Sequence, residues 1–405
     1  MKKTLLYFFL AISFLTGACN STSKEEEAFH ACMRPAFHSH IYLPVTISDS
    51  IRGQFVFDTG ATGFYLDSLF YAENFSSQAY PLGKALLQGA GVEQKITPLV
   101  AIPLAFSIDT LSEEYQSSIT PLIELKEILG RKADGIVGKD FFGAAAGKYL
   151  AIDYLHGGFA VASTLPDTSG YRRIALELHN GQLFLHTRIS ISGKQIEGPF
   201  LLDTGCGGSI ILTRSTAQQY ALEQLPCEKA RYRFYPGGIG GYSEQTNLLA
   251  QEAVLDTFRL KDLSVAYSSD TAGALSSRDY LGLIGNKILN RFDVILDLKD
   301  NYLYLRPNAY YAQPYENYGS GLLCTDRTDI CEGVVITGLR VESAAEEAGV
   351  MLGDVLLAID TTQVKHLSEE QIEHLLQDTT RASVVLSLQR NGQSLKRSIK
   401  PERGL

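Results

Sequence analysis

Two stretches of the chain share one pattern, in which an apolar run leads into Asp-Thr-Gly and a second apolar run follows. They read FVFDTGATGFYLD at residues 55–67 and FLLDTGCGGSIIL at residues 200–212. One such triplet says little, because Asp and Gly are common wherever a chain turns tightly. Its recurrence in the same setting indicates a duplication, which further matches between the two halves can test.

Other features recur at nearly the same spacing. The equivalent positions are Asp58 and Asp203, 145 residues apart; Gly138 and Gly285, 147 residues apart; and Asp153 and Asp297, 144 residues apart. A Gly-rich turn also follows the Asp-Thr-Gly triplet in each half, LLQGAGVEQ in the first and YPGGIGGYSEQ in the second. Four features in one order predict a tandem repeat of one domain of roughly 125 residues.

From about residue 36 onward, the sequence pattern is typical of a mainly β protein. Short alternating apolar runs are broken by Gly, Asn and Asp, and HIYLPVTIS with GQFVFDTG, like HTRISISG with GPFLLDTG, predicts a β-hairpin. Trp is absent, whereas 21 Tyr and 19 Phe favour strands. The 405 residues, 45% of them hydrophobic, suffice for two or three domains with cores.

Composition also excludes some functions. A net charge of −9 without a clustered basic surface speaks against a nucleic-acid partner. No Cys or His spacing resembles a zinc site, and His38 and His40 alternate with apolar or small residues on one predicted strand, so no metal site is expected.

Duplicated carboxylates point to acid–base chemistry. If the two repeats face each other across a pseudo-twofold axis, Asp58 and Asp203 come together. Two close carboxyl groups cannot both ionise cheaply and therefore share a proton. One then acts as general base on a water while the other donates to a carbonyl group.

These motifs resemble those of the retropepsin-like aspartic proteases, in which an apolar run with Asp-Thr-Gly precedes an apolar-apolar-Gly segment. FVFDTGAT with GIVG and FLLDTGCG with GLIG match it, over residues 36–307. The resemblance implies two pseudo-twofold-related β-barrel lobes, 36–165 and 170–307, in one chain. The protease unit is therefore expected to be a monomeric, intramolecular pseudo-dimer without a cofactor.

The resemblance also assigns roles to residues. It implies that Asp58 and Asp203 are catalytic and that the hydroxyls of Thr59 and Thr204 brace the paired loops. Gly60 and Gly205 would let the backbone turn beside the carboxylates. The flap candidates are Gly89, Gly91, Gly238, Gly240 and Tyr242, although an exposed loop position remains the alternative for Tyr242.

The second loop departs from the family pattern at Cys206, which is followed by Gly207 and Gly208. A thiol is small enough to fit, and a cysteine nucleophile remains an alternative, although no His is placed to activate it. Among the other cysteines, Cys324 and Cys331 can close a short disulfide loop, but sequence does not fix the pairing.

After a Tyr-rich linker at residues 308–318, residues 319–405 resemble a bacterial PDZ domain. The matching features are the strand at 334–336, a short helix from Ser343 that ends at Ala348-Gly349-Val350, and Gly353-Asp354 before VLLAID. PDZ domains bind a peptide as an added strand. Gly321, Leu322 and Leu323 are the candidate peptide-binding residues, and a purely structural or docking role for the domain remains open.

The N-terminus predicts export. MKK followed by an apolar run and small residues predicts a signal peptide at 1–18. Cys19 resembles the lipidated cysteine of bacterial lipoproteins, although Thr16 stands where Leu is usual, and residues 19–35 form a polar tether. SKEEE resembles the surface-export signal of Bacteroidetes lipoproteins, with a solvated linker as the alternative. The expected place is the outer membrane, on its periplasmic or cell-surface side, anchored by lipid.

We therefore expect an aspartic endopeptidase that hydrolyses peptide bonds and whose PDZ domain binds or positions a peptide or protein substrate. The alternative is an inactive, peptide-binding envelope lipoprotein. A purely structural lipoprotein is disfavoured, because a scaffold has no need for two like charges in one site.

Overall fold

The structure is a computed structural model. It describes residues 40–75, 80–87, 89, 93–108, 111, 113–142, 148–236, 238–239, 241–315, 321–331, 333–402 and 405. The predicted signal peptide, the tether with Cys19, and the flap candidates Gly91 and Gly240 lie outside the described residues. Strands dominate the chain, as expected, and no described helix is long and apolar enough to cross a membrane.

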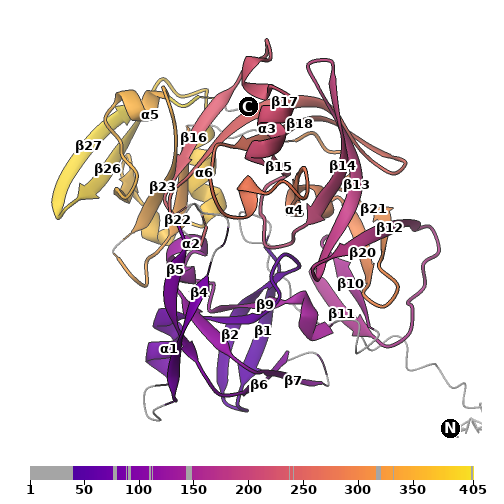
Figure 1. Ribbon diagram of the computed structural model, residues 1–405. Coiled ribbons are helices and arrows are strands. Elements are labelled where there is room, and N and C mark those ends of the chain that lie inside the picture. Colours follow the sequence, from indigo (N-terminus) through magenta and orange to yellow (C-terminus); the bar gives the residue numbers. More distant parts are fainter. Residues whose placement is uncertain are drawn as a thin grey trace, which may run out of the picture.

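The first lobe, drawn in indigo and purple in Figure 1, forms the lower part of the molecule. Its elements are β1 (Tyr42–Ile47), β2 (Ile51–Asp58), β3 (Phe64–Asp67), α1 (Ser68–Asn74), β4 (Leu82–Leu87), β5 (Lys95–Val100), β6 (Leu104–Ile108), β7 (Glu114–Ser117), β8 (Thr120–Ile123), α2 (Leu125–Leu129), β9 (Gly135–Gly138), η1 (Lys139–Phe142), β10 (Tyr149–Asp153) and β11 (Gly158–Ala162). As predicted, β1 and β2 form a hairpin that leads into the first Asp-Thr-Gly.

The second lobe has a related but not identical order of elements. Its elements are β12 (Arg172–His179), β13 (Gln182–Ile191), β14 (Lys194–Leu202), β15 (Ile210–Leu212), α3 (Arg214–Gln219), η2 (Leu222–Gln224), β16 (Ala230–Phe234), β17 (Ser243–Leu255), β18 (Phe258–Ser268), η3 (Ala274–Ser276), β19 (Gly282–Ile284), α4 (Asn286–Leu289), β20 (Phe292–Asp297) and β21 (Tyr302–Pro307). The predicted hairpin before the second Asp-Thr-Gly is β13 with β14.

The same crossing of strands surrounds each Asp-Thr-Gly. In the first lobe, β9 pairs in parallel with β2, which ends at Asp58, and antiparallel with β3, which follows the triplet. In the second lobe, β19 pairs in the same way with β14 and β15. These pairings confirm that the apolar-apolar-Gly segments are short buried strands and that the two halves share one fold.

The lobes join through one antiparallel sheet and one core. Its strand order is β11, β10, β20, β21, β12, and the equivalent strands β10 and β20 pair with each other. Ala151 opposite Ile295 is the centre of that pairing, which is where an approximate twofold axis relates the lobes. A single cluster of buried side chains runs through both lobes. The lobes are thus held together by the burial of apolar side chains as well as by strand pairing.

The C-terminal region has its own core. Its elements are β22 (Leu322–Asp326), β23 (Val334–Arg340), α5 (Ala344–Glu347), β24 (Val355–Ile359), β25 (Thr362–Gln363), η4 (Val364–His366), α6 (Glu369–Gln377), β26 (Val384–Arg390) and β27 (Gln393–Ile399). Gly349 and Gly353 adopt φ of 81° and 86°, which explains the two glycines at these turns. Ser368 and Gln371 form the capping box that starts α6.

The C-terminal region docks on both lobes. β23 pairs with β22 along one edge, and its other edge is shared between β24 and β16 of the second lobe. At the first lobe, the N–H of Arg131 donates to the carbonyl of Asp326 at 2.9 Å. Figure 1 shows this region, in orange and yellow, beside β16 and above α2.

Candidate active site

The two Asp-Thr-Gly loops meet because each threonine bridges to the opposite loop. The hydroxyl of Thr59 donates to the carbonyl of Leu202 at 2.6 Å and accepts from the N–H of Thr204 at 3.0 Å. The hydroxyl of Thr204 does the same with the carbonyl of Phe57 at 2.9 Å and the N–H of Thr59 at 3.0 Å. Both threonines are buried, so each bond satisfies a group that water does not reach.

The reciprocal bonds bring the two carboxyl groups against each other. Oδ1 of Asp58 accepts from the N–H groups of Gly60 and Ala61 at 2.7 and 3.0 Å, and Oδ1 of Asp203 accepts from that of Gly205 at 2.9 Å. A Cβ on Gly205 would lie 2.7 Å from Oδ1 of Asp58 and closer still to Oδ2. Glycine is therefore required there by the close approach of the opposite carboxylate.

Burial sets the protonation of the pair. It raises the pKa of Asp58 above its ordinary value, while hydrogen bonds from the N–H groups of Gly60 and Ala61 oppose the shift. The pKa of Asp203 is raised well above its ordinary value, first by burial and then by the charge of Asp58. Both shifts favour a pair that shares one proton, and the larger rise in pKa favours Asp203 as the group that holds it.

Apolar-apolar-Gly segments support both loops from behind. A Cβ on Gly138 would lie 2.6 Å from the carbonyl oxygen of Ala61, and one on Gly285 would lie 2.5 Å from that of Gly208. The side chain of Asn286 donates to the carbonyl of Thr204 at 2.5 Å and accepts from Tyr154 at 2.8 Å. The sequence did not predict a role for Asn286, whose signal is an amide directly after the apolar-apolar-Gly segment.

Cys206 is a packing residue in this structure. Burial and then the charge of Asp203 raise the pKa of its thiol to about 12, so it stays protonated. Its Sγ would lie 2.9 Å from a Cβ on Gly285, which shows how closely the thiol fills the space behind the loop. Both observations argue against the cysteine-nucleophile alternative.

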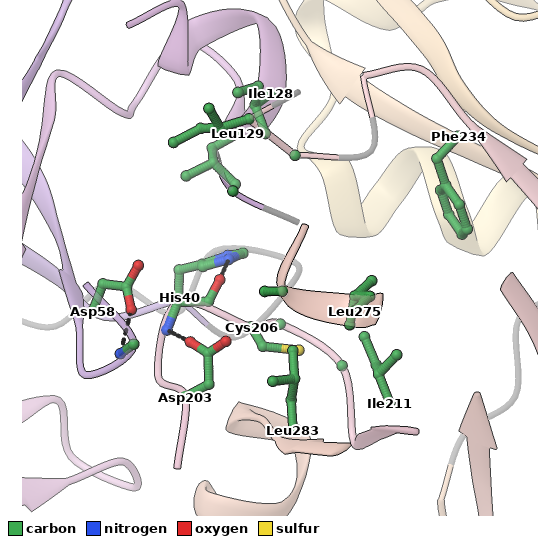
Figure 2. A pocket seen from close by; sticks show the side chains of 18 of the residues that line it. His40, Asp58, Ile128, Leu129, Asp203, Cys206, Ile211, Phe234, Leu275 and Leu283 are labelled. Carbon is green, nitrogen blue, oxygen red and sulfur yellow. Dashed lines mark hydrogen bonds between the residues drawn. The ribbon is translucent and has the colours of Figure 1, made fainter. Parts of the chain in front are cut away.

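His40 is a further residue at the site without a predicted role. Its Nε2 lies 3.1 Å from the carbonyl of Gly205, so the ring of the first lobe donates to the second Asp-Thr-Gly loop. The imidazole is 7% exposed, and burial lowers its pKa to about 4. Figure 2 shows the ring beside Asp58 and Asp203. His40 was considered in the sequence only for metal binding, and no metal-binding cluster occurs among the described residues.

The carboxylates lie on a cavity of about 640 Å³. Its lining is mostly apolar and includes Ile128, Leu129, Ile211, Leu275 and Leu283, which Figure 2 shows around the two aspartates. An extended cavity with apolar walls and two carboxyl groups suits a peptide, whose side chains bury apolar area while its backbone reaches the acids.

The Gly-rich turns lie at the ends of two hairpins, β4 with β5 and β16 with β17, and Gly89, Gly238 and Ile239 of these turns line the cavity. Their ends touch, because a Cβ on Gly89 would lie 2.7 Å from Cβ of Ile239. Gly238 adopts φ of 118° beside Ile239. Tyr242 is 38% exposed and its hydroxyl reaches Glu244 at 3.3 Å, which supports the exposed-loop alternative.

The predicted PDZ peptide site is a shallow hollow of about 20 Å³ between β22 and α6. Leu322 is buried there with Val334, Ile372 and Leu376. Gly321 adopts φ of 72° and its carbonyl accepts from the N–H of Arg340 at 2.7 Å. Leu323 lines this hollow and also the large cavity. Cys324 and Cys331 are not joined by a disulfide in this structure.

Comparison with known proteins agrees with the C-terminal assignment. Residues 335–390 match the family model of the PDZ domain. The C-terminal region contains a PDZ domain. No curated protein sequence matches the chain. Among solved structures, basic 7S globulin from soybean superposes with a TM-score of 0.41 and 10% identity, covering 70% of this chain and 96% of that chain.

Proposed function

We propose that the protein is an aspartic endopeptidase in which a water activated between Asp58 and Asp203 hydrolyses a peptide bond. The observation that carries the proposal is the pairing of two partly buried carboxyl groups on the large apolar cavity, held by reciprocal hydrogen bonds of Thr59 and Thr204. A structural role does not call for two such groups in contact, because their burial destabilises the fold.

The protonation of the pair suggests the order of events. Ionised Asp58 takes a proton from the water as its oxygen attacks the carbonyl carbon, while the proton on Asp203 passes to the carbonyl oxygen. The tetrahedral intermediate then collapses. Asp58 gives its proton to the leaving amine, and Asp203 regains one from the hydroxyl. The Gly60 and Ala61 N–H groups stabilise Asp58 while it is charged.

The PDZ domain supports a peptide or protein as the substrate, since the family binds peptides as added strands. In the described residues β22 pairs only with β23, so its edge toward α6 is available for such a strand. Export with a lipid anchor at Cys19 stays part of the proposal and rests on the sequence of residues 1–19 alone.

The test is cleavage of a diverse peptide library by the purified protein, from about pH 3 to about pH 8. Asp58→Asn and Asp203→Asn are compared with Asp262→Asn, an exposed position with φ of 52° that asparagine tolerates. We expect both dyad variants to lose cleavage by about 10³-fold or more and the control to retain it. The rate should fall at low pH, where Asp58 takes up a proton, and at high pH, where Asp203 loses its own.

The outcomes separate the candidate functions. Cleavage that survives in either dyad variant contradicts the mechanism. If no form cleaves but the library peptides bind, the protein is the peptide-binding alternative.

A further inference from the structure

One wall of the catalytic cavity comes from the PDZ domain. Leu323 and Thr325 of β22 and Thr337 of β23 line it, together with Phe234 at the end of β16. The hydroxyls of Thr325 and Thr337 bond to each other at 2.8 Å, and both residues are buried. The hydrogen-bonding capacity of the two hydroxyls is thus partly met by each other, which makes this wall less polar than two threonines imply.

Strand pairing explains how residues from two domains form this wall. β16 pairs with β23, and β23 pairs with β22, so Phe234 and Leu323 both stand opposite Gly338. A Cβ on Gly338 would lie 2.7 Å from Cδ1 of Leu323 and 3.1 Å from Cδ1 of Phe234. The two large side chains therefore pack against Gly338 from either side. Figure 2 shows Phe234 across the cavity from the aspartates.

The wall is held in place at both ends. At β16, the N–H of Tyr235 donates to the carbonyl of Thr337 at 2.8 Å, and that of Val341 donates to the carbonyl of Arg231 at 2.8 Å. At the first lobe, a Cβ on Gly130 would lie 3.4 Å from Cγ2 of Thr325, directly after α2. The PDZ strands thus close the cavity between α2 of one lobe and the β16–β17 hairpin of the other.

We propose that Leu323, with Phe234, forms a specificity subsite of the catalytic cleft that takes an apolar side chain of the substrate. Through this wall the PDZ domain then helps to select which peptide bond is cleaved. This role is separate from any binding of a peptide beside α6. The inference rests on the proposed peptidase function and names PDZ residues as part of its substrate-binding surface.

Changing the size of Leu323 tests the subsite in the full chain. Leu323→Ala enlarges it and should shift cleavage toward peptides with a larger apolar side chain at one position. Leu323→Phe should shift it the opposite way at that same position. A change of one or two methylene groups in an apolar pocket alters kcat/KM by about 10-fold or more, so each preference ratio should move by that amount.

Two controls isolate the effect. Leu395→Ala makes the same change in β27, where Leu395 is half-buried against the PDZ core but does not line the cavity. Ile372→Val alters only the α6 hollow. Both should leave the preference unchanged. Thermal unfolding of every variant confirms that each is folded, and Leu323→Phe remains informative should the alanine variant be unstable.

The readout also separates this inference from the proposed function. Binding of the same library to Asp203→Asn is also measured, which gives the side-chain preference without turnover. Cleavage or binding by the parent protein with an unchanged preference in both Leu323 variants overturns the subsite alone. A shift caused by Ile372→Val instead assigns the preference to the α6 hollow. Absence of both cleavage and binding in the parent protein overturns the proposed function, and the subsite with it.

Discussion

At the scale of single residues, the site depends on hydrogen bonds that have no substitute partners. The hydroxyl of Thr204 donates to the carbonyl of Phe57 and accepts from the N–H of Thr59 in a buried place. Thr204→Val keeps the shape but leaves both backbone groups unsatisfied. We expect it to lower the free energy of unfolding by about 2–6 kcal/mol, because each of the two orphaned groups costs about 1–3 kcal/mol.

Denaturant unfolding measures this loss. Thr204→Ser retains the hydroxyl and should lose much less than the valine variant. Equal losses in the two variants would mean that packing of the methyl group, and not the hydrogen bonds, holds the loops together.

His40 makes the stability of the fold depend on pH. The pKa of its imidazole is 6.5 in the unfolded chain and about 4 in the folded protein, because burial disfavours the charged ring. Between those values the unfolded chain binds a proton that the folded chain does not. The folded state is therefore not penalised by the buried His40 above about pH 6.5. As the pH falls from 6.5 toward 4, the free energy of unfolding decreases by up to about 1.4 kcal/mol per pH unit.

His40→Gln tests this dependence, because an amide still donates to the carbonyl of Gly205 but does not titrate. The free energy of unfolding should fall less steeply between pH 6.5 and 4 in the variant than in the parent. The raised pKa values of Asp58 and Asp203 have the opposite effect, since the stability that their protonation adds is lost as the pH rises. Both carboxyl groups are present in the parent and in the variant, so their effect cancels in the comparison. Parallel curves would contradict a neutral, buried His40.

At the scale of elements, the short strand β19 and the helix after it position the second Asp-Thr-Gly loop. Gly285→Ala would place a Cβ 2.5 Å from the carbonyl of Gly208 and 2.6 Å from that of Cys206, both of them backbone atoms that cannot move alone. We expect the loop with Asp203 to shift and kcat to fall by about 10²-fold, since misplacement by about 1 Å costs this much.

Gly208→Ala is the matched control in the same loop. Its nearest contact would be Sγ of Cys206 at 3.5 Å, an ordinary packing distance. Steady-state kinetics of the two variants should differ in kcat far more than in KM. An equal, small effect in both would show that β19 does not fix the position of Asp203.

Local patterns in the sequence predicted the elements that the repeat shares. The two Asp-Thr-Gly loops, their threonine contacts, and β9 and β19 behind them follow from motifs that recur in order. The pairing of β16 with β23 did not, because it joins residues about 100 positions apart and leaves no periodic signal in either strand. The contact of His40 with the second loop was not predictable for a similar reason, since its partner Gly205 belongs to the other lobe.

At the scale of the whole molecule, three parts surround one cavity, and their docking affects its shape. The lobes share a continuous core, whereas the PDZ domain has a core of its own. The PDZ domain is therefore joined to the first lobe mainly by surface contacts, and among them Nε of Arg131 lies 2.8 Å from Oδ2 of Asp326. Weakening this contact should loosen the PDZ wall without unfolding either core.

Arg131→Glu tests that coupling, because it replaces the cation with a like charge beside Asp326 and Asp329. We expect kcat/KM to fall several-fold and to recover in part as salt is raised, since repulsion between charges near the surface is screened within about 8 Å at physiological ionic strength and within less at higher salt. Arg188→Glu, which faces Glu197 within the second lobe, is the control and should change neither the rate nor its salt dependence. If Arg131→Glu loses activity equally at all salt concentrations, the loss comes from local disruption after α2. If it loses none, the PDZ domain keeps its place without this contact, and the strand pairing with β16 alone holds the wall of the cavity.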